Sequence, residues 1–432
     1  MDLDEYKDLI EPFVRNHVVP EFVSVAPFLR YRACWMVEYF DHEDWKMDDT
    51  VPVLLQGLLQ GLRDPAIPVQ AAAACSMREL IATDGAVDLL RPYLHQIVSE
   101  YFRIMNEVEN EAILGALQGI VESFGDDIDP IAGMMVSHLV EKFDSFTSQC
   151  QGDADDDEAA FNASQCLDTI ICILDAIQGR DDTLLQVEAI IIPLLIRITD
   201  KGDDSFEYLD SVIQILSVLM YSDAPISPGI FSLCGPLLST LDSYAFDYIS
   251  DMTEILLTYM KKDMYSFLHG VIPRDNNIPF PTVLLNVIQK HFQEDTSEYE
   301  LDCKSAASLL TCFIYLSKPL AAISSQVGDL LRIILLRLEK TKTTSLRHKL
   351  LEGVMALIYY DPQLFVSILS TNDAVGALLF NTLFDNVKVM ENTFSQKLIV
   401  LSFTSLLSLD VATIPDYIKA NLSVTLLLLL LL

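Results

Sequence analysis

The feature that most constrains this chain is a spacing of apolar residues that fits one face of an α-helix. Apolar side chains fall at i, i+3, i+4, i+7, i+8 and i+11 in Ile113, Ala116, Leu117, Ile120, Val121 and Phe124. The same spacing recurs from Val327 to Leu338, and almost completely from Leu209 to Met220. Each set forms one apolar stripe on a helix, whereas a sustained strand-like alternation is absent. The sequence therefore predicts an all-α chain of about eighteen to twenty helices.

A second pattern repeats at the scale of a helix pair. After the helix breaker Asp64-Pro65 the sequence places Val69-Gln70, then Ala73, then Met77. The same frame begins at Leu29-Arg30, at Ile113-Leu114 and at Leu346-Arg347. The marks at 29, 69 and 113 are 40 and 44 residues apart. A period of about 40–47 residues made of paired helices is typical of HEAT and armadillo repeats.

Helix pairs of this kind bury their apolar stripes only by stacking on their neighbours. At roughly 43 residues per pair, the 432 residues predict a HEAT-repeat α-solenoid of about ten antiparallel pairs, with a long concave surface. Coincidence among Leu-rich helices is the alternative, and the agreement of frame, breaker and spacing argues against it. The length alone would suggest about three domains, but a solenoid has no single core. We expect such a fold to hold a large partner.

The charge of the chain is strongly negative and unevenly distributed. The chain has 62 Asp and Glu and 28 Lys and Arg, which gives a net charge of −34. Residues 1–300 hold 52 acids and 17 bases, whereas residues 301–432 hold 10 and 11. Direct binding of nucleic acid or of an anionic membrane is disfavoured, because both need a basic surface. We therefore divide the solenoid into an acidic segment, 1–300, which suits a basic partner, and a near-neutral segment, 301–432.

One short segment concentrates this charge. Residues 151–158 hold five acids within six positions, which repel one another and predict an exposed loop. The segment is either a solvated linker or a flexible anionic finger that grips a basic ligand. Smaller acidic turns, such as those at Asp126-Asp127 and Asp203-Asp204, either stabilise helix N-termini or bind a ligand along one rim of the solenoid. The candidate binding residues are Asp153, Asp155, Asp156, Asp157, Glu158, Asp126, Asp127, Asp203 and Asp204.

Catalytic, cofactor and metal motifs are missing from the sequence. Phosphate-binding glycine loops, H-E-x-x-H and G-x-S-x-G do not occur. The eight cysteines form no C-x-x-C pair, and most are expected to be small buried hydrophobes. His138 shares an apolar stripe with Met134 and Met135, which predicts a core histidine, and His42-Glu43-Asp44 lacks a second histidine for a metal site. We expect a non-enzymatic chain without cofactor or metal.

Nothing in the sequence predicts secretion or membrane insertion. Acids occur throughout the first eleven residues, unlike a signal peptide. The charge-free run from Ala224 to Leu241 is broken by prolines and glycines, and the terminal Leu426–Leu432 run is too short to span a bilayer.

Several segments, in order along most of the chain, resemble one protein family. The stretch Arg30–Phe40 resembles the R-A-R-A-C-W-V-L-x-Y-F helix of the importin-β superfamily, in its importin-7 and importin-8 branch. The resemblance continues through Asn110-Glu111, Phe124–Ala132, the acidic loop with Ala159-Ala160, Phe246–Met252, and Leu346–Pro362. The matched region corresponds to the C-terminal half of that family.

The resemblance implies a nuclear import receptor that shuttles between cytoplasm and nucleus. Such receptors bind basic cargo such as ribosomal proteins and histones, the latter alongside importin-β. They pass nucleoporin FG repeats and release cargo on Ran-GTP. We expect the N-terminal arch that makes the main Ran contact to lie outside this chain. Gln70 replaces the family's usual Arg or Lys, which predicts an interrupted ladder of hydrogen bonds between repeats.

Other functions share the predicted fold. An export receptor would need Ran-GTP to bind its cargo. A HEAT-repeat scaffold for an enzyme complex would bind folded partners with weak salt dependence. A chaperone of histones or ribosomal proteins would share the electrostatics without Ran or FG repeats. An importer's basic cargo should dissociate steeply as salt rises.

Overall fold

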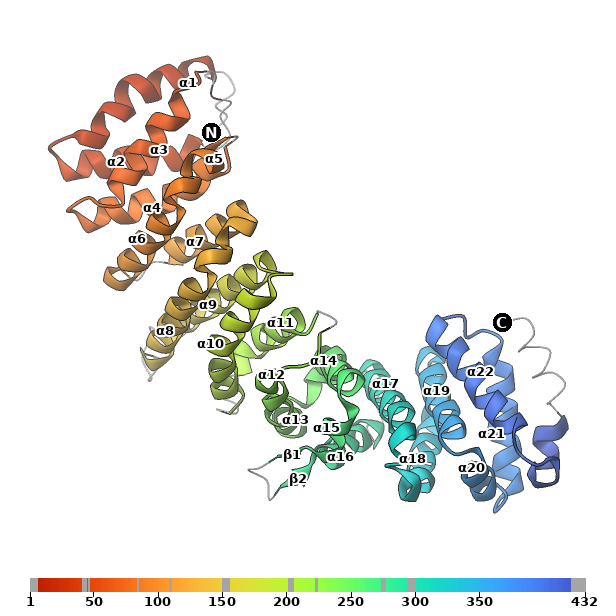
Figure 1. Ribbon diagram of the computed structural model, residues 1–432. Coiled ribbons are helices and arrows are strands. Elements are labelled where there is room, and N and C mark those ends of the chain that lie inside the picture. Colours follow the sequence, from red (N-terminus) through yellow and green to blue (C-terminus); the bar gives the residue numbers. More distant parts are fainter. Residues whose placement is uncertain are drawn as a thin grey trace. The chain divides into compact units, whose positions relative to one another are not determined.

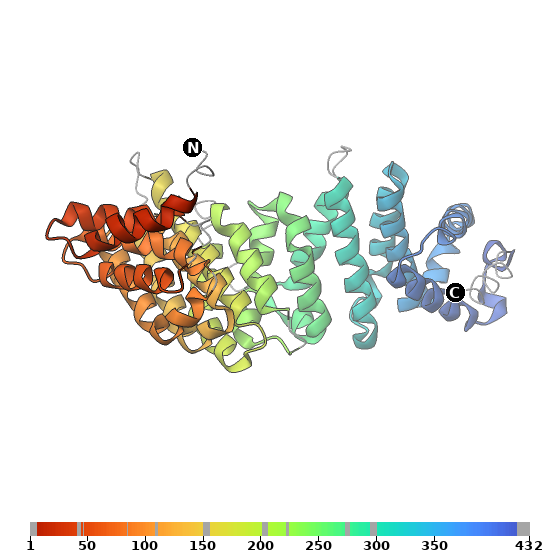
Figure 2. The same ribbon diagram turned by 90° about the horizontal axis from the view of Figure 1, so that it is seen from above.

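The computed structural model describes residues 7–40, 45, 47–83, 85–108, 111–149, 156–200, 206–221, 224–272, 277–293 and 300–420. Two compact units divide the chain. Unit 1 comprises Met1–Leu195 with Tyr208–Ser222, and unit 2 comprises Ile196–Glu207 with Asp223–Leu432. Figures 1 and 2 show that, within each unit, successive helices lie side by side.

Unit 1 is entirely helical in its described part. Its helices are α1 (Lys7–Phe13), α2 (Pro27–Val37), α3 (Thr50–Gly61), α4 (Ile67–Ile81), α5 (Ala86–Leu90), α6 (Leu94–Glu107), α7 (Glu111–Phe124), α8 (Ala132–Gln149), α9 (Asp156–Ala176), most of α10 (Asp181–Asp200) and α11 (Leu209–Leu219). A π-helical turn, Val14–Val18, follows α1, and a 3-10 turn, Gly125–Ile131, joins α7 to α8. The apolar spacings thus predicted α7 and α11 closely.

Unit 2 contains α12 (Pro228–Ser232), α13 (Cys234–Asp242), α14 (Ile249–Lys262), α15 (Met264–His269), α16 (Phe280–Gln293), α17 (Glu300–Ser317), α18 (Val327–Lys340), α19 (Thr344–Tyr360), α20 (Pro362–Leu369), α21 (Asp373–Val387) and α22 (Thr393–Leu407). The all-α prediction is confirmed, with one small addition. The two-residue strands β1 (Val271–Ile272) and β2 (Ile278–Pro279) pair antiparallel. Within the described residues, no helix is both long and apolar enough to cross a bilayer.

The second helices of successive pairs pack against one another in each unit, and we call them the B row. The B row of unit 1 is α2, α4, α7, α9 and α11, and that of unit 2 is α14, α17, α19 and α22. The repeat frames found in the sequence lie on α2, α4, α7 and α19, which all belong to the B row. Apart from the half-buried Leu29, their marked apolar residues are buried; Ala73, Leu117 and Val354 are each 0% exposed. The frame therefore identified the helices that form the spine of each unit.

The first helices of the pairs form the A row: α3, α6 and α8 in unit 1, and α13, α16 and α18 in unit 2. In this row, donor side chains bond to backbone carbonyls at the C-terminal end of the preceding A helix. Arg103 Nη2 on α6 lies 2.9 Å from the Leu62 oxygen, and Lys142 Nζ on α8 lies 2.7 Å from the Met105 oxygen. In unit 2, Lys290 Nζ on α16 lies 3.1 Å from the Asp242 oxygen. These carbonyls have no partner within their own helix.

The B row has bonds of its own. Arg30 on α2 donates from Nε to Asp64 at 2.6 Å, and both side chains are largely buried. The same carboxylate accepts from the Ala66 backbone N–H, so Asp64 turns the chain into α4 without being its N-cap residue. The Arg30–Asp64 pair thus links one repeat frame to the next.

The expectation that Gln70 interrupts the hydrogen-bond ladder between repeats is wrong, because Gln70 itself forms hydrogen bonds there. Its side-chain Nε2 donates to the Asp64 backbone oxygen, and its Oε1 accepts from Arg103 Nη2 at 3.1 Å. Arg103 on α6 thereby ties Gln70 and the end of α3 together. An amide suffices at this position because Arg103 brings the positive charge.

Cysteines contribute to packing, as the sequence predicted. Cys34, Cys166, Cys234 and Cys303 are at most 1% exposed, and Cys312 is 8% exposed. Burial raises the pKa of the Cys34 and Cys166 thiols to about 12. Such thiols stay protonated and unreactive at neutral pH.

Replacing Lys142 tests the A-row bond. Lys142→Met keeps the apolar stem but removes the donor to the Met105 carbonyl. We expect a loss of about 1–2 kcal/mol in the free energy of unfolding, because a hydrogen bond from a charged group is lost. Urea unfolding followed by circular dichroism measures it. Lys388→Met, at an exposed lysine beyond α21, is the control and should leave the midpoint unchanged. Equal midpoints for both variants would show that the bond adds no stability.

A buried histidine makes unit 2 sensitive to acid. His291 on α16 is 0% exposed and stacks on Phe246 with ring centroids 3.7 Å apart and planes 4° apart. Burial lowers the pKa of His291 from 6.5 to about 4. Between these values the unfolded chain binds a proton that the folded chain does not, so stability is lost as pH falls from 6.5 toward 4.

His291→Phe removes this titration and keeps an aromatic ring against Phe246. Between pH 7 and pH 4 we expect the parent to lose up to about 3 kcal/mol more unfolding free energy than the variant. Urea midpoints across that range measure it. Parallel pH curves for the two chains would contradict the effect of His291.

Candidate functional site

Three carboxylates from two B-row helices converge around one half-buried thiol in unit 1. Burial raises the pKa of Cys172 on α9, and the nearby charges of Glu122 on α7 and of Asp168 and Asp175 on α9 raise it further. Glu122 and Asp175 are exposed, and Asp168 is half-buried. Because α7 and α9 pack together, residues about 50 positions apart in the sequence form one acidic cluster.

Asp168 is the partly buried member of the acidic cluster. Burial raises the pKa of Asp168 above its ordinary value, so the charged form of this carboxylate is disfavoured. Gln118 Nε2 donates to Glu122 Oε1 at 3.1 Å and orients it. A Lys or Arg side chain placed here would stabilise the charged carboxylates and lower the pKa of Asp168. The arrangement favours binding of a basic ligand.

Further acids extend the cluster along the same row. Glu38, which directly follows α2, is exposed and raises the pKa of Cys75 on α4. Glu79 on α4 is half-exposed. Trp35 on α2 and Tyr39 in the following 3-10 turn lie with ring centroids 4.5 Å apart, and the Arg32 guanidinium lies 4.1 Å from the Trp35 ring centroid. The B-row face of unit 1, defined by Glu38, Glu79, Glu122, Asp168 and Asp175, therefore combines carboxylates with aromatic rings.

The acids of this face recur in the sequence at the repeat period, and a search for local charge clusters does not find them. Glu38, Glu79, Glu122 and Asp168 are 41, 43 and 46 residues apart, which is the repeat period itself. Glu79 is the only acid of α4, and Glu122 and Asp168 stand apart from the other acids of α7 and α9, so a search for charge runs passes over them. Applying the repeat period to exposed positions, as well as to apolar ones, would have found the row.

Two of the candidate residues have partners within the chain. Asp126 and Asp127 lie in the 3-10 turn Gly125–Ile131. Asp126 pairs with Arg180 at 3.3 Å, and Asp127 pairs with Arg91 at 2.7 Å. Both pairs tie this turn to neighbouring helices of unit 1, and neither carboxylate contributes to the B-row face.

The acidic segment is partly helical. Asp157 and Glu158 are exposed in the first turn of α9, which begins at Asp156. The prediction of a loop through residue 158 is therefore wrong at its end, since acids are stabilised at a helix N-terminus. Asp153, Asp155, Asp203 and Asp204 lie outside the described residues.

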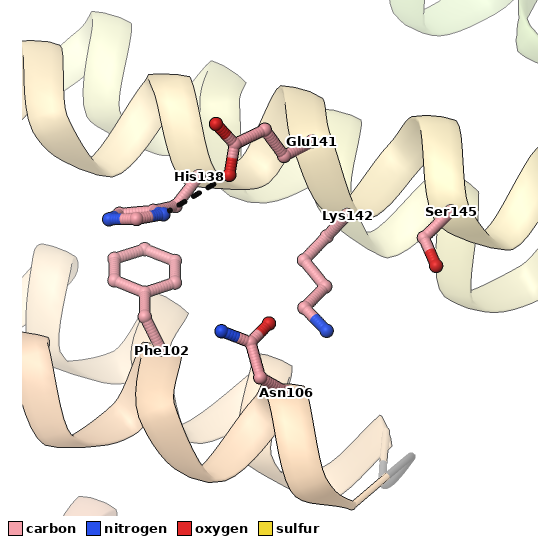
Figure 3. A pocket seen from close by; sticks show the side chains of 6 residues that line it. All are labelled: Phe102, Asn106, His138, Glu141, Lys142 and Ser145. Atoms are coloured by element: carbon pink, nitrogen blue, oxygen red, sulfur yellow. Dashed lines mark ion pairs between the residues drawn. The ribbon is translucent and has the colours of Figure 1, made fainter.

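A small pocket of about 140 Å³ lies between α6 and α8 of the A row. Figure 3 shows Phe102 and Asn106 rising from α6 toward His138, Glu141 and Lys142 on α8. His138 packs on Phe102 with centroids 4.7 Å apart, and its Nδ1 lies 3.5 Å from Glu141. His138 is 42% exposed, so the prediction of a core histidine is wrong; the ring covers Phe102 from the solvent side.

Metal-binding groups are not found among the described residues, in which no three His, Cys, Asp or Glu side chains gather suitably. His42, Glu43 and Asp44 lie outside that part of the chain. The described part of the chain instead offers surfaces, of which the acidic B-row face of unit 1 is the strongest candidate.

Comparison with known proteins relates the chain to importins. No family model matches it. It is 27% identical to a probable importin-7 homolog of Dictyostelium discoideum over 430 residues, and 27% identical to an importin beta-like SAD2 homolog of Arabidopsis thaliana over 422 residues. It is also 27% identical to importin-8 of Mus musculus over 365 residues. These alignments cover 98%, 95% and 83% of this chain, but only 38%, 40% and 34% of the relatives.

A solved structure supports the fold. The karyopherin Kap95p, determined with RanGDP, matches 96% of this chain and 50% of its own with a TM-score of 0.60 and 14% identity. The likeness concerns the fold alone, and it confirms the HEAT-repeat architecture predicted from the sequence.

Proposed function

Because this chain belongs to the importin-7 and importin-8 branch of the importin-β family, we propose that it takes part in nucleocytoplasmic transport by binding basic cargo proteins. Importins are non-enzymatic transport receptors, in agreement with the prediction that the chain is not an enzyme. Its cargo would be ribosomal proteins or histones, the latter alongside importin-β. The chain would shuttle between cytoplasm and nucleus.

The observation that carries the cargo proposal is the acidic cluster of Glu122, Asp168 and Asp175. The pKa of Asp168 is raised by burial, which disfavours its charged form. A Lys or Arg side chain of the cargo would stabilise this charge and gain binding free energy. The other acids of the B-row face lie one repeat period apart. An extended basic segment can therefore contact several repeats, and its binding should depend strongly on salt.

Partners of the transport cycle follow from the family. Kap95p, which shares the fold, binds Ran, and we propose Ran-GTP and FG nucleoporins as partners of this chain. The chain spans 38% of the length of its Dictyostelium relative.

Binding of a linker histone across a salt series tests the cargo proposal. We expect tight binding at low salt that weakens steeply as salt rises, because exposed charges are screened. Fluorescence anisotropy of labelled histone measures it, with and without Ran-GTP. Release by Ran-GTP would support import, whereas a requirement for Ran-GTP would indicate export. Weak salt dependence would favour a scaffold, and absence of binding at low salt would contradict the cargo proposal.

Two sets of variants locate the cargo surface. Glu122→Gln, Asp168→Asn and Asp175→Asn together should weaken histone binding roughly ten-fold, since each exposed charge pair contributes about 0.2–1 kcal/mol. Replacing Asp153, Asp155, Asp156, Asp157 and Glu158 by Ser should also weaken binding if the acidic segment grips cargo, without changing helicity or melting.

The matched control removes three acids from α8 and α10 of unit 1: Glu141→Gln, Asp144→Asn and Asp182→Asn. It changes net charge equally but spares the B-row face. Equal weakening by the control and the Glu122 set would indicate general charge attraction and exclude a defined site. Unchanged affinity of the Ser variant would remove residues 153–158 from the mechanism.

A further inference from the structure

In unit 2 the B row carries a group of aromatic rings with lysines over them. Tyr315 on α17 and Tyr359 on α19 stack with centroids 5.6 Å apart and planes 25° apart. Phe394 on α22 meets Tyr315 edge-on with centroids 6.3 Å apart. Three neighbouring B-row helices, seen together in Figure 1, thus contribute one ring each to a continuous aromatic surface.

Two ammonium groups lie over these rings. Lys318 Nζ is 4.2 Å from the centroid of Tyr359, and Lys397 Nζ is 5.4 Å from that of Tyr315. Lys318 also donates to the Tyr359 and Tyr360 carbonyls at the end of α19, which fixes its position. Lys397 is exposed, and Phe394 is 38% exposed. We call Tyr315, Tyr359, Phe394, Lys318 and Lys397 the cation–aromatic face.

Nearby carboxylates are bonded within the chain. Glu352 is 1% exposed and bonds to Ser395 and Lys349. Asp361 accepts from the Leu364 N–H at 2.9 Å and caps α20. Lys304 lies eleven residues before Tyr315 on the same side of α17, since eleven residues make about three turns. Asp361 still acts electrostatically on Lys318, so the positive charge of the cation–aromatic face comes mainly from the exposed Lys397.

We propose that the cation–aromatic face binds an extended acidic peptide segment of a partner protein, one that carries aromatic or proline side chains between its carboxylates. The rings offer flat apolar contact, and the lysines offer charge-assisted bonds to carboxylates. The cation–aromatic face has the same sign of charge as the basic cargo proposed for unit 1 and repels it, so the two ligands are different. A polyanion such as single-stranded RNA fits less well, because it carries one charge per nucleotide and a chain of net charge −34 repels it more strongly than a segment with a few carboxylates.

Short synthetic peptides test this binding. One alternates Glu with Phe and Pro, a second replaces each Glu by Lys, and a third probe is oligouridylate, each labelled for fluorescence anisotropy with the full chain. We expect the Glu peptide to bind in a salt-sensitive way and the Lys peptide not to compete with it. Equal affinity for both peptides would overturn the acidic partner, and tighter binding of oligouridylate would replace it by a nucleic acid.

Variants place the peptide on the face. Lys397→Glu should weaken the Glu peptide roughly five-fold, and Phe394→Ser roughly ten-fold, with urea midpoints close to the parent's. Lys388→Glu, an exposed lysine beyond α21, is the charge-matched control and should change affinity little. Histone binding should stay unchanged in Lys397→Glu, which separates this inference from the cargo proposal. Equal losses for Lys397→Glu and Lys388→Glu would overturn the site.

Discussion

The stacking of both units depends on bonds from side-chain donors to the C-terminal carbonyls of a helix in a neighbouring repeat. Each helix end leaves carbonyls unpaired and carries partial negative charge, and a stack of short helices has many such ends. Arg103, Lys142, Lys290 and Lys318 each satisfy one or two of these carbonyls across a repeat boundary. Where α13 follows α10 in unit 2, the hydroxyl of Thr240 takes the same role, 3.5 Å from the Thr199 oxygen.

These bonds also shape the surface charge. The chain has 28 basic side chains against 62 acidic ones, and several of the bases are engaged between repeats or in pairs such as Arg30–Asp64 and Arg91–Asp127. On the exposed side of the B row, Glu79 pairs with Arg78 at 3.7 Å, and the remaining acids outnumber the bases. The negative face of unit 1 is thus partly a consequence of how the repeats are joined.

Periodic features of the sequence predicted the fold well, and local charge clusters predicted the site poorly. The apolar frames at Leu29, Val69, Ile113 and Leu346 all lie on B-row helices, because burial at each repeat fixes residue type. Charge runs mark turns, where helix ends meet and carboxylates such as Asp126 and Asp127 pair with arginines. The cluster of Glu122, Asp168 and Asp175 forms only when α7 packs on α9, and no contiguous stretch of sequence contains it.

The two B-row faces exploit one geometry for opposite charges. A B-row helix exposes one residue near the same height in every repeat, so a ligand that runs along the row meets side chains at a regular spacing. In unit 1 these are carboxylates, and a segment rich in Lys or Arg gains at each repeat while an acidic one is repelled. In unit 2, Lys397 over Tyr315 and Lys318 over Tyr359 reverse that preference. Since like charges disfavour the wrong ligand on each face, specificity arises from repulsion as much as from attraction.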